Sequence, residues 1–89
     1  MISNPYIDEH HNDFFIRTFS ENTDCDDLIW HRDRNDRLIT ILKSNNWKLQ
    51  FDNQLPIFLI ENYSYFIPKE VFHRIIKGTG DLIIKIVEY

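Results

Sequence analysis

The sequence has little of what several classes of protein require. It has one cysteine, Cys25, so no disulfide can form within the chain and a disulfide-stapled scaffold is excluded. Two glycines and three prolines among 89 residues exclude a collagen-like fibre and a low-complexity linker. No apolar run approaches the roughly 20 residues that a membrane-spanning helix needs. Residues 1–6 lack the basic and apolar regions of a signal peptide, so we expect a cytoplasmic protein without a membrane partner.

The chain also lacks a basic excess. Ten basic and fourteen acidic side chains give a net charge of −4, with −6 over residues 1–36 and +2 over residues 37–89. Proteins that bind nucleic acid usually concentrate basic side chains on one face. The weak excess in the second part of the chain is poor support for that role, so we expect no nucleic-acid partner.

Apolar bulk is abundant. Hydrophobic residues make up 43% of the chain and aromatic residues 15%, and there are fourteen isoleucines. This composition excludes a disordered tail. A chain of 89 residues forms one domain at most and buries about two-thirds of the surface of its unfolded form. Such a chain needs efficient packing, a staple or association with copies of itself.

From residue 26 onward, short apolar segments recur every 8–10 residues, separated by polar turns. Trp47, Leu49 and Phe51 alternate with polar residues, as in a half-buried strand. No segment has convincing helical periodicity. The pattern predicts an all-β fold, a small antiparallel barrel or sandwich. The predicted strands are residues 26–31, 37–43, 47–51, 55–60, 63–67, 71–77 and 81–88, and Gly78-Thr79-Gly80 is predicted to be a hairpin turn.

Residues 1–23 have a different pattern. Two polar clusters, residues 8–13 and 20–24, flank a predicted strand over residues 14–19 in which Arg17 points outward. We expect residues 1–23 to form an edge strand, or an arm that pairs with a second subunit in a homodimer, and residues 24–89 to form the barrel.

His31 and His73 are the strongest candidates for chemistry, because each lies in an apolar predicted strand. On a strand, His31 and Asp33 point to the same face. A buried imidazole needs a hydrogen-bond partner or a metal. Two imidazoles and a carboxylate in one cavity would form a facial triad for a divalent transition metal. The pattern alone favours the alternative, structural histidines held by hydrogen bonds, and it favours a solvated loop for His10 and His11.

Residues 62–73, NYSYFIPKEVFH, are similar to a motif of the cupins, a family of small jelly-roll barrels (double-stranded β-helices). That motif reads Gly, five residues, Pro, one residue, Gly, two residues, His. Pro68 and His73 keep its spacing, whereas Asn62 and Glu70 replace the glycines.

The other cupin motif reads His-x-His, three or four residues, Glu, six residues, Gly. Here His31-Arg32-Asp33 stands for its beginning, Arg37 falls where the Glu would be, and Ser44 falls on the Gly. The segment over residues 26–88 thus resembles a cupin with a degenerate first motif.

The resemblance implies a metal site inside the barrel formed by His31, Asp33 and His73, with Fe, Mn, Zn or Ni as the ion; a barrel without metal stays open. Arg37 cannot coordinate a cation and remains charged. It either points away from the site, pairs with Asp33, or orients an anionic group of a small ligand. Asp36 is a further oxygen ligand if its turn brings it inward.

Trp30 and Tyr65 are candidate ligand-binding residues, at the pocket wall and the barrel mouth. The order His-x-Asp…His also resembles iron- and 2-oxoglutarate-dependent oxygenases, in which Lys77 or Lys85 would bind the co-substrate, but the helices of those enzymes are missing from the pattern. Cys25 lies among acidic residues, which disfavour a nucleophilic thiolate.

Three functional hypotheses stay open. The first is a metal-dependent enzyme, and the second a non-catalytic cupin that binds a small molecule. The third is a homo-oligomeric structural protein. The Asn- and Ile-rich composition is typical of an AT-rich genome, bacterial or phage, and a phage origin would favour an assembly role. The short chain leads us to expect any active site inside the barrel or at an interface with another copy.

Overall fold

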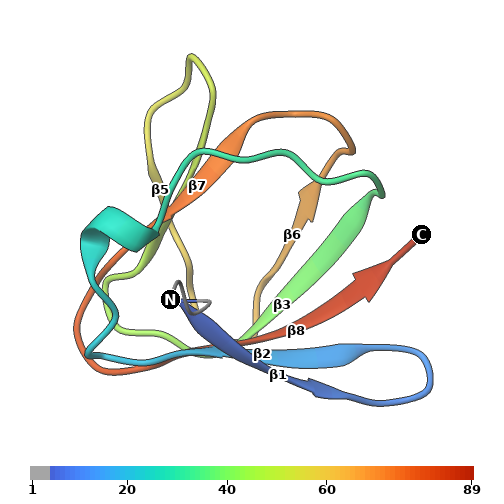
Figure 1. Ribbon diagram of the computed structural model, residues 1–89, viewed down its shortest axis with the longest axis horizontal. Helices are drawn as coiled ribbons and strands as arrows, with labels where there is room; N and C mark the ends of the chain where they lie inside the picture. The colour runs from blue at the N-terminus through green and yellow to red at the C-terminus, as the bar shows by residue number, and fades with distance from the viewer. Residues whose placement is uncertain (1–4) are drawn as a thin grey trace.

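The computed structural model describes residues 5–89, which form an almost entirely β structure (Figure 1). This confirms the predicted fold class, and β3 matches the predicted strand over residues 37–43. No helix among the described residues is long and apolar enough to cross a membrane. The elements in chain order are β1 (Tyr6–His10), β2 (Phe15–Phe19), the 3-10 helix η1 (Cys25–Asp27), β3 (Arg37–Lys43), β4 (Lys48–Phe51), β5 (Ile57–Phe58), β6 (Ser64–Ile67), β7 (His73–Ile76) and β8 (Leu82–Glu88).

The strands form two antiparallel sheets. One sheet has five strands in the order β1-β2-β8-β3-β6, and the other has three in the order β5-β4-β7. Because β7 and β8 belong to different sheets, the prediction of a hairpin at residues 78–80 was wrong, and this segment crosses from one sheet to the other. A Cβ atom at Gly78 would collide with the Asn45 carbonyl oxygen, so the crossing requires a glycine there.

The β1–β2 hairpin extends the larger sheet through the pairing of β2 with β8. The prediction of a polar loop over residues 8–13 was wrong as far as His10, because β1 runs through it. Arg17 is buried between Phe15 and Phe19, so its predicted outward orientation was also wrong. Phe15, Arg17 and Phe19 form the inward face of β2. The division into residues 1–23 and 24–89 stays a prediction.

The predicted strand over residues 26–31 was wrong as well. The chain instead forms η1, which begins after Asp24, whose carboxylate accepts a hydrogen bond from the Asp26 amide at 2.9 Å. Aspartate side chains compete for backbone amides in this way and favour turns over strands. Of the predicted strand, His31 alone keeps a strand-like bridge, to His73.

The core lies between the two sheets and consists of inward-facing residues from both. The Trp47 indole nitrogen donates to the carbonyl oxygens of Thr79 and Gly80, at 3.3 and 3.2 Å, so this large buried side chain has its polar atom satisfied. Trp47 and Leu49 are buried as their alternation predicted. The core residues are Phe15, Phe19, Ile39, Ile41, Trp47, Leu49, Leu59, Ile67, Ile75, Leu82, Ile84 and Ile86.

Two leucines provide a matched test of this core. Leu49 is 0% exposed and Leu55 is 87% exposed. We expect Leu49→Ala to lower the free energy of unfolding by about 3 kcal/mol, because it removes buried methyl groups and leaves a cavity. Leu55→Ala should change it by less than about 0.5 kcal/mol. Urea unfolding of the two variants measures the difference, and equal effects would contradict the core.

Candidate functional site

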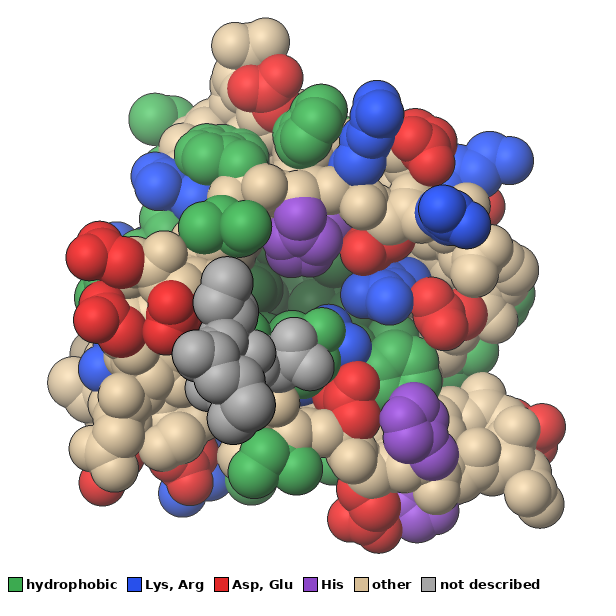
Figure 2. Space-filling view, in the orientation of Figure 1, with side chains coloured by type: hydrophobic (Ala, Val, Ile, Leu, Met, Phe, Trp, Pro, Cys, Tyr) green, Lys and Arg blue, Asp and Glu red, His purple; other side chains and the backbone are tan. Residues whose placement is uncertain are grey.

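His31, Asp33 and His73 lie together, with one ligand atom from each within 4.8 Å of the others. His73 is buried at the start of β7, and the other two lie on the loop between η1 and β3. His31 and Asp33 line a cavity of about 390 Å³, which opens as a hollow on the face seen in Figure 2. The structure thus brings together the three residues predicted to bind metal.

Backbone pairing holds the two histidines side by side. The amide of His31 donates to the carbonyl of His73 at 3.0 Å, and the amide of His73 donates to the carbonyl of His31 at 2.9 Å. Residues paired across antiparallel strands project to the same side. The centroids of the two rings are therefore only 4.3 Å apart.

Each imidazole has its Nδ1 atom on a backbone carbonyl. Nδ1 of His31 lies 3.1 Å from the Ile29 oxygen, and Nδ1 of His73 lies 2.9 Å from the Val71 oxygen. A carbonyl oxygen only accepts, so Nδ1 carries the proton in both rings. A neutral ring then presents the lone pair of Nε2. Histidines that bind metals are commonly held in this way, by a hydrogen bond from the other ring nitrogen.

The Asp33 carboxylate faces both Nε2 atoms. Its Oδ1 lies 3.8 Å from Nε2 of His31, and its Oδ2 lies 3.4 Å from Nε2 of His73. Oδ2 is buried and has no hydrogen-bond partner among the residues described.

The protonation of His73 determines what lies in this gap. Burial lowers the pKa of His73, and the charges of His31 and Arg37 act in the same direction, although the Val71 carbonyl and Asp33 oppose them. The neutral ring therefore turns a lone pair toward a carboxylate oxygen that receives no proton. Two acceptors facing each other in a buried gap fit a bound cation.

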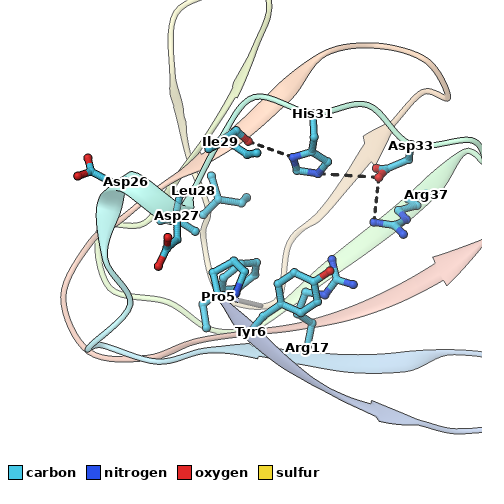
Figure 3. A pocket seen from close by; sticks show the side chains of 12 residues that line it. Pro5, Tyr6, Arg17, Asp26, Asp27, Leu28, Ile29, His31, Asp33 and Arg37 are labelled. Carbon is cyan, nitrogen blue, oxygen red and sulfur yellow. Dashed lines mark hydrogen bonds and ion pairs between the residues drawn. The ribbon is translucent and has the colours of Figure 1, made fainter. Parts of the chain in front are cut away.

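Arg37 pairs with Asp33, which is one of the three alternatives that the sequence left open for this arginine. Its Nη1 lies 3.3 Å from Oδ1 of Asp33, and its Nε donates to Oε2 of Glu88 at 3.0 Å. Figure 3 shows His31, Asp33 and Arg37 in a row along one side of the cavity. Because Arg37 approaches Oδ1, the Oδ2 atom beside His73 stays uncommitted.

The turn before β7 supports Asp33 from behind. The amide of Glu70 donates to the Asp33 carbonyl at 2.8 Å, and the amide of Lys69 donates to Oδ1 of Asp36 at 2.7 Å. Asp36 therefore caps this turn and is not part of the cluster of His31, Asp33 and His73. Glu70 and Asn62, which replace the motif glycines, have φ values of 62° and 70°. Both positions therefore keep the left-handed backbone conformation that favours glycine, although neither residue is a glycine.

Trp30 and Tyr65 do not line the cavity. Trp30 is partly exposed, and the guanidinium of Arg74 lies 4.8 Å from the centroid of its ring. The Tyr65 hydroxyl donates to the Phe58 carbonyl and accepts from the Ile60 amide, both at 2.9 Å. These contacts give both side chains other partners, and their ligand-binding role stays a prediction.

The two lysines considered for a co-substrate also lie outside the cavity lining. Lys77 donates to the Thr23 carbonyl at 2.8 Å, and the Lys85 ammonium lies 4.7 Å from the centroid of the Phe14 ring.

The sequence reasoning missed Arg17, which lines the cavity from β2. Its Nε and Nη2 donate to the two oxygens of Asp8 at 2.8 and 2.9 Å, and its guanidinium lies 3.5 Å from the centroid of the Tyr6 ring. A signal was present, since Asp8 and Arg17 face each other if residues 6–10 form a strand.

Fold and site together define a small two-sheet jelly roll with a histidine and carboxylate cluster at its cavity. A cupin domain from Bordetella pertussis Tohama I superposes with a TM-score of 0.64 at 17% identity, over 100% of this chain and 98% of that one. A cupin-2 domain protein from Shewanella frigidimarina gives 0.64 at 22% identity, over 90% and 74% of the two chains. The chain therefore has the cupin fold, as the motif resemblance implied.

Larger proteins share the fold. The Co(II) form of HppE in complex with Tris buffer superposes with a TM-score of 0.74 at 16% identity, over 100% of this chain and 56% of that one. A chain from the DMSP lyase structures gives 0.70 at 15% identity, over 84% and 36%. This chain thus spans about half or less of their length. No protein-family model matches it, and the search of curated proteins finds no significant match.

The lowered pKa of His73 makes a prediction for the metal-free protein. The unfolded chain takes up this proton near pH 6.5, whereas the native state does so only at lower pH. The free energy of unfolding should therefore decrease as the pH falls below about 6.5. Urea unfolding with a chelator present, from about pH 7.5 to about pH 5.5, measures it. His73→Gln should make the dependence shallower, and His10→Gln, an exposed control, should not. An unchanged slope in His73→Gln would contradict the assignment.

Proposed function

We propose that this cupin binds one divalent transition metal through Nε2 of His31, Nε2 of His73 and the Asp33 carboxylate. The observation that supports it is the buried gap in which Oδ2 of Asp33 and Nε2 of His73 face each other without a proton donor. Two imidazoles and one carboxylate suit Fe²⁺, Mn²⁺, Zn²⁺ or Ni²⁺ better than Ca²⁺ or Mg²⁺, which prefer oxygen ligands alone.

The site has room for a small ligand. Three protein ligands leave coordination positions open, and His31 and Asp33 border the cavity from which a ligand would enter. A metal bound there would act as a Lewis acid on an oxygen of that ligand. Arg37 beside Asp33 would orient an anionic group. HppE, which shares this fold, has been solved in Fe(II) and Co(II) forms, and this supports metal binding on the fold.

Metal titration with matched histidine variants tests this proposal. His31→Gln and His73→Gln should each weaken Zn²⁺ binding at least about 100-fold, since each removes a ligand. The readouts are metal content after dialysis and the visible absorption of the Co²⁺-loaded protein. His10→Gln should bind like the wild type. Equal metal content in all four proteins, or none in any, would refute the site.

A second proposal concerns assembly: the chain forms a homodimer through the outer face of its five-stranded sheet. Apolar side chains are exposed there on both edge strands, Ile7 at 78% and Phe66 at 52%. Small domains bury more apolar surface by association.

We also propose the cytoplasmic location that the sequence predicts. The exposed free thiol of Cys25 is consistent with a reducing compartment.

Sedimentation of charge variants tests the dimer. Ile7→Lys and Phe66→Lys should each yield monomers, because a buried unpaired charge opposes association. Leu55→Lys, at an exposed turn, should not. Deleting residues 1–23 is unsuitable, since it removes β2 with the core residues Phe15 and Phe19. A wild-type monomer, or dimers in all variants, would refute this interface.

A further inference from the structure

Arg17 is a buried charge that the metal site does not use. Arg17 is 9% exposed, and its Nε and Nη2 donate hydrogen bonds to the Asp8 carboxylate. Nη1 has no hydrogen-bond partner among residues 5–89 in the structure, although Arg17 lines the cavity. Asp8 and Tyr6 therefore hold a rigid guanidinium with one amino group left to donate. A guanidinium N–H group that has no protein partner and lies on a cavity needs an acceptor, from water or from a ligand.

Arg37 is held in the same manner. Glu88 binds its Nε and Asp33 approaches its Nη1, which leaves Nη2 without a partner among the described residues. The guanidinium carbons of Arg17 and Arg37 lie 5.4 and 5.8 Å from the centroid of the Phe15 ring. Two guanidiniums held by carboxylates thus lie near one aromatic ring, and both arginines line one cavity.

The charges at this end of the cavity specify the charge of a ligand. The two guanidiniums face three carboxylates, those of Asp8, Asp33 and Glu88, which leaves one negative charge in excess. A divalent ion at the proposed metal site reverses the balance to one positive charge. A ligand with a single negative charge then neutralises this end of the cavity, and a carboxylate matches the flat, paired donors of a guanidinium.

The remaining lining limits the rest of the ligand. Phe19, Leu28, Ile29 and Ile75 contribute apolar surface. Asp26 and Asp27 lie across the cavity from Arg37, where they would repel a second anionic group (Figure 3). A volume of about 390 Å³ is at the small end of the range for ligand pockets.

We infer that Arg17 and Arg37 bind the carboxylate of a small monoanionic ligand whose short apolar body lies against Leu28 and Ile29. The inference rests on the proposed metal site for the sign of the net charge, but the arginine pair is a separate set of residues. Arg17 is a binding residue that recognises the ligand without touching the metal.

Calorimetric titration of the Zn²⁺-loaded protein with butyrate tests this inference. Butyramide, of similar shape but neutral, and inorganic phosphate, titrated at about pH 8 so that it is mainly a dianion, are the comparison probes. The variant is Arg17→Gln combined with Asp8→Asn, which removes both charges and so avoids a buried unpaired carboxylate. Arg74→Gln is the control, because Arg74 lies outside the cavity on Gln50 and Trp30.

We expect wild type and Arg74→Gln to bind butyrate equally, and the double variant to bind it at least about tenfold more weakly, as for a lost charge-assisted hydrogen bond. Butyramide and phosphate should bind more weakly than butyrate to the wild type. Unchanged affinity in the double variant, or equal binding of butyramide, overturns the inference. Tighter binding of phosphate than of butyrate overturns the inference that the ligand carries a single negative charge.

Zinc content of the same samples separates the two proposals. Zinc retained with butyrate binding independent of Arg17 overturns the arginine site alone. No zinc uptake by the wild type overturns the metal site. In that case, if the metal-free protein binds butyrate and the double variant binds it more weakly, the arginine site is supported. If the metal-free protein does not bind butyrate, both the metal site and the arginine site are overturned. Circular dichroism of the double variant checks that it is folded.

Discussion

Two backbone hydrogen bonds between His31 and His73 determine where the site forms. The segment between η1 and β3 contains no other strand pairing, so this single bridge attaches the loop to β7. It places both imidazoles on the inner side. Trp30, next to His31, does not line the cavity, whereas Asp33, two residues beyond His31, does. The amide of Glu70 then fixes Asp33 from the neighbouring turn. The geometry of the cluster thus follows from the backbone before any ligand is bound.

In this cluster one carboxylate, that of Asp33, faces three side chains, and one of its oxygens receives no hydrogen bond. Asp33 has one oxygen toward Arg37 and His31 and the other toward His73. Desolvation keeps His73 neutral, so it cannot supply the proton that the second oxygen needs. A structural histidine would be expected to donate to its carboxylate. The Nδ1 atoms of both imidazoles face backbone carbonyls instead, which is the arrangement that the proposed metal site needs.

Much of this was predictable where local pattern decides the structure. Trp47 and Leu49 alternate and are buried, and Pro68 and His73 carry a spacing that a turn and a strand impose. The errors arose where tertiary contacts override local pattern. Asp24, Asp26 and Asp27 favour η1, although the Leu28 and Ile29 that follow favour a strand. Arg17 is buried because Asp8 lies opposite it, a pairing that is invisible unless β1 is recognised among polar residues.

The departures from the cupin motifs divide into two kinds. Asn62 and Glu70 replace glycines yet keep positive φ, so the turns that position Asp33 and His73 survive. Arg37 is different, because it stands where the motif has a glutamate and changes the chemistry. A carboxylate there would add a fourth anionic or metal-binding group, whereas a guanidinium pinned by Glu88 adds a donor. Relative to the motif, the site loses a negative charge and gains a positive one beside Asp33. That exchange favours a ligand that brings its own negative charge, and the remaining amino group of Arg17, near the same Phe15 ring, is a second donor for it.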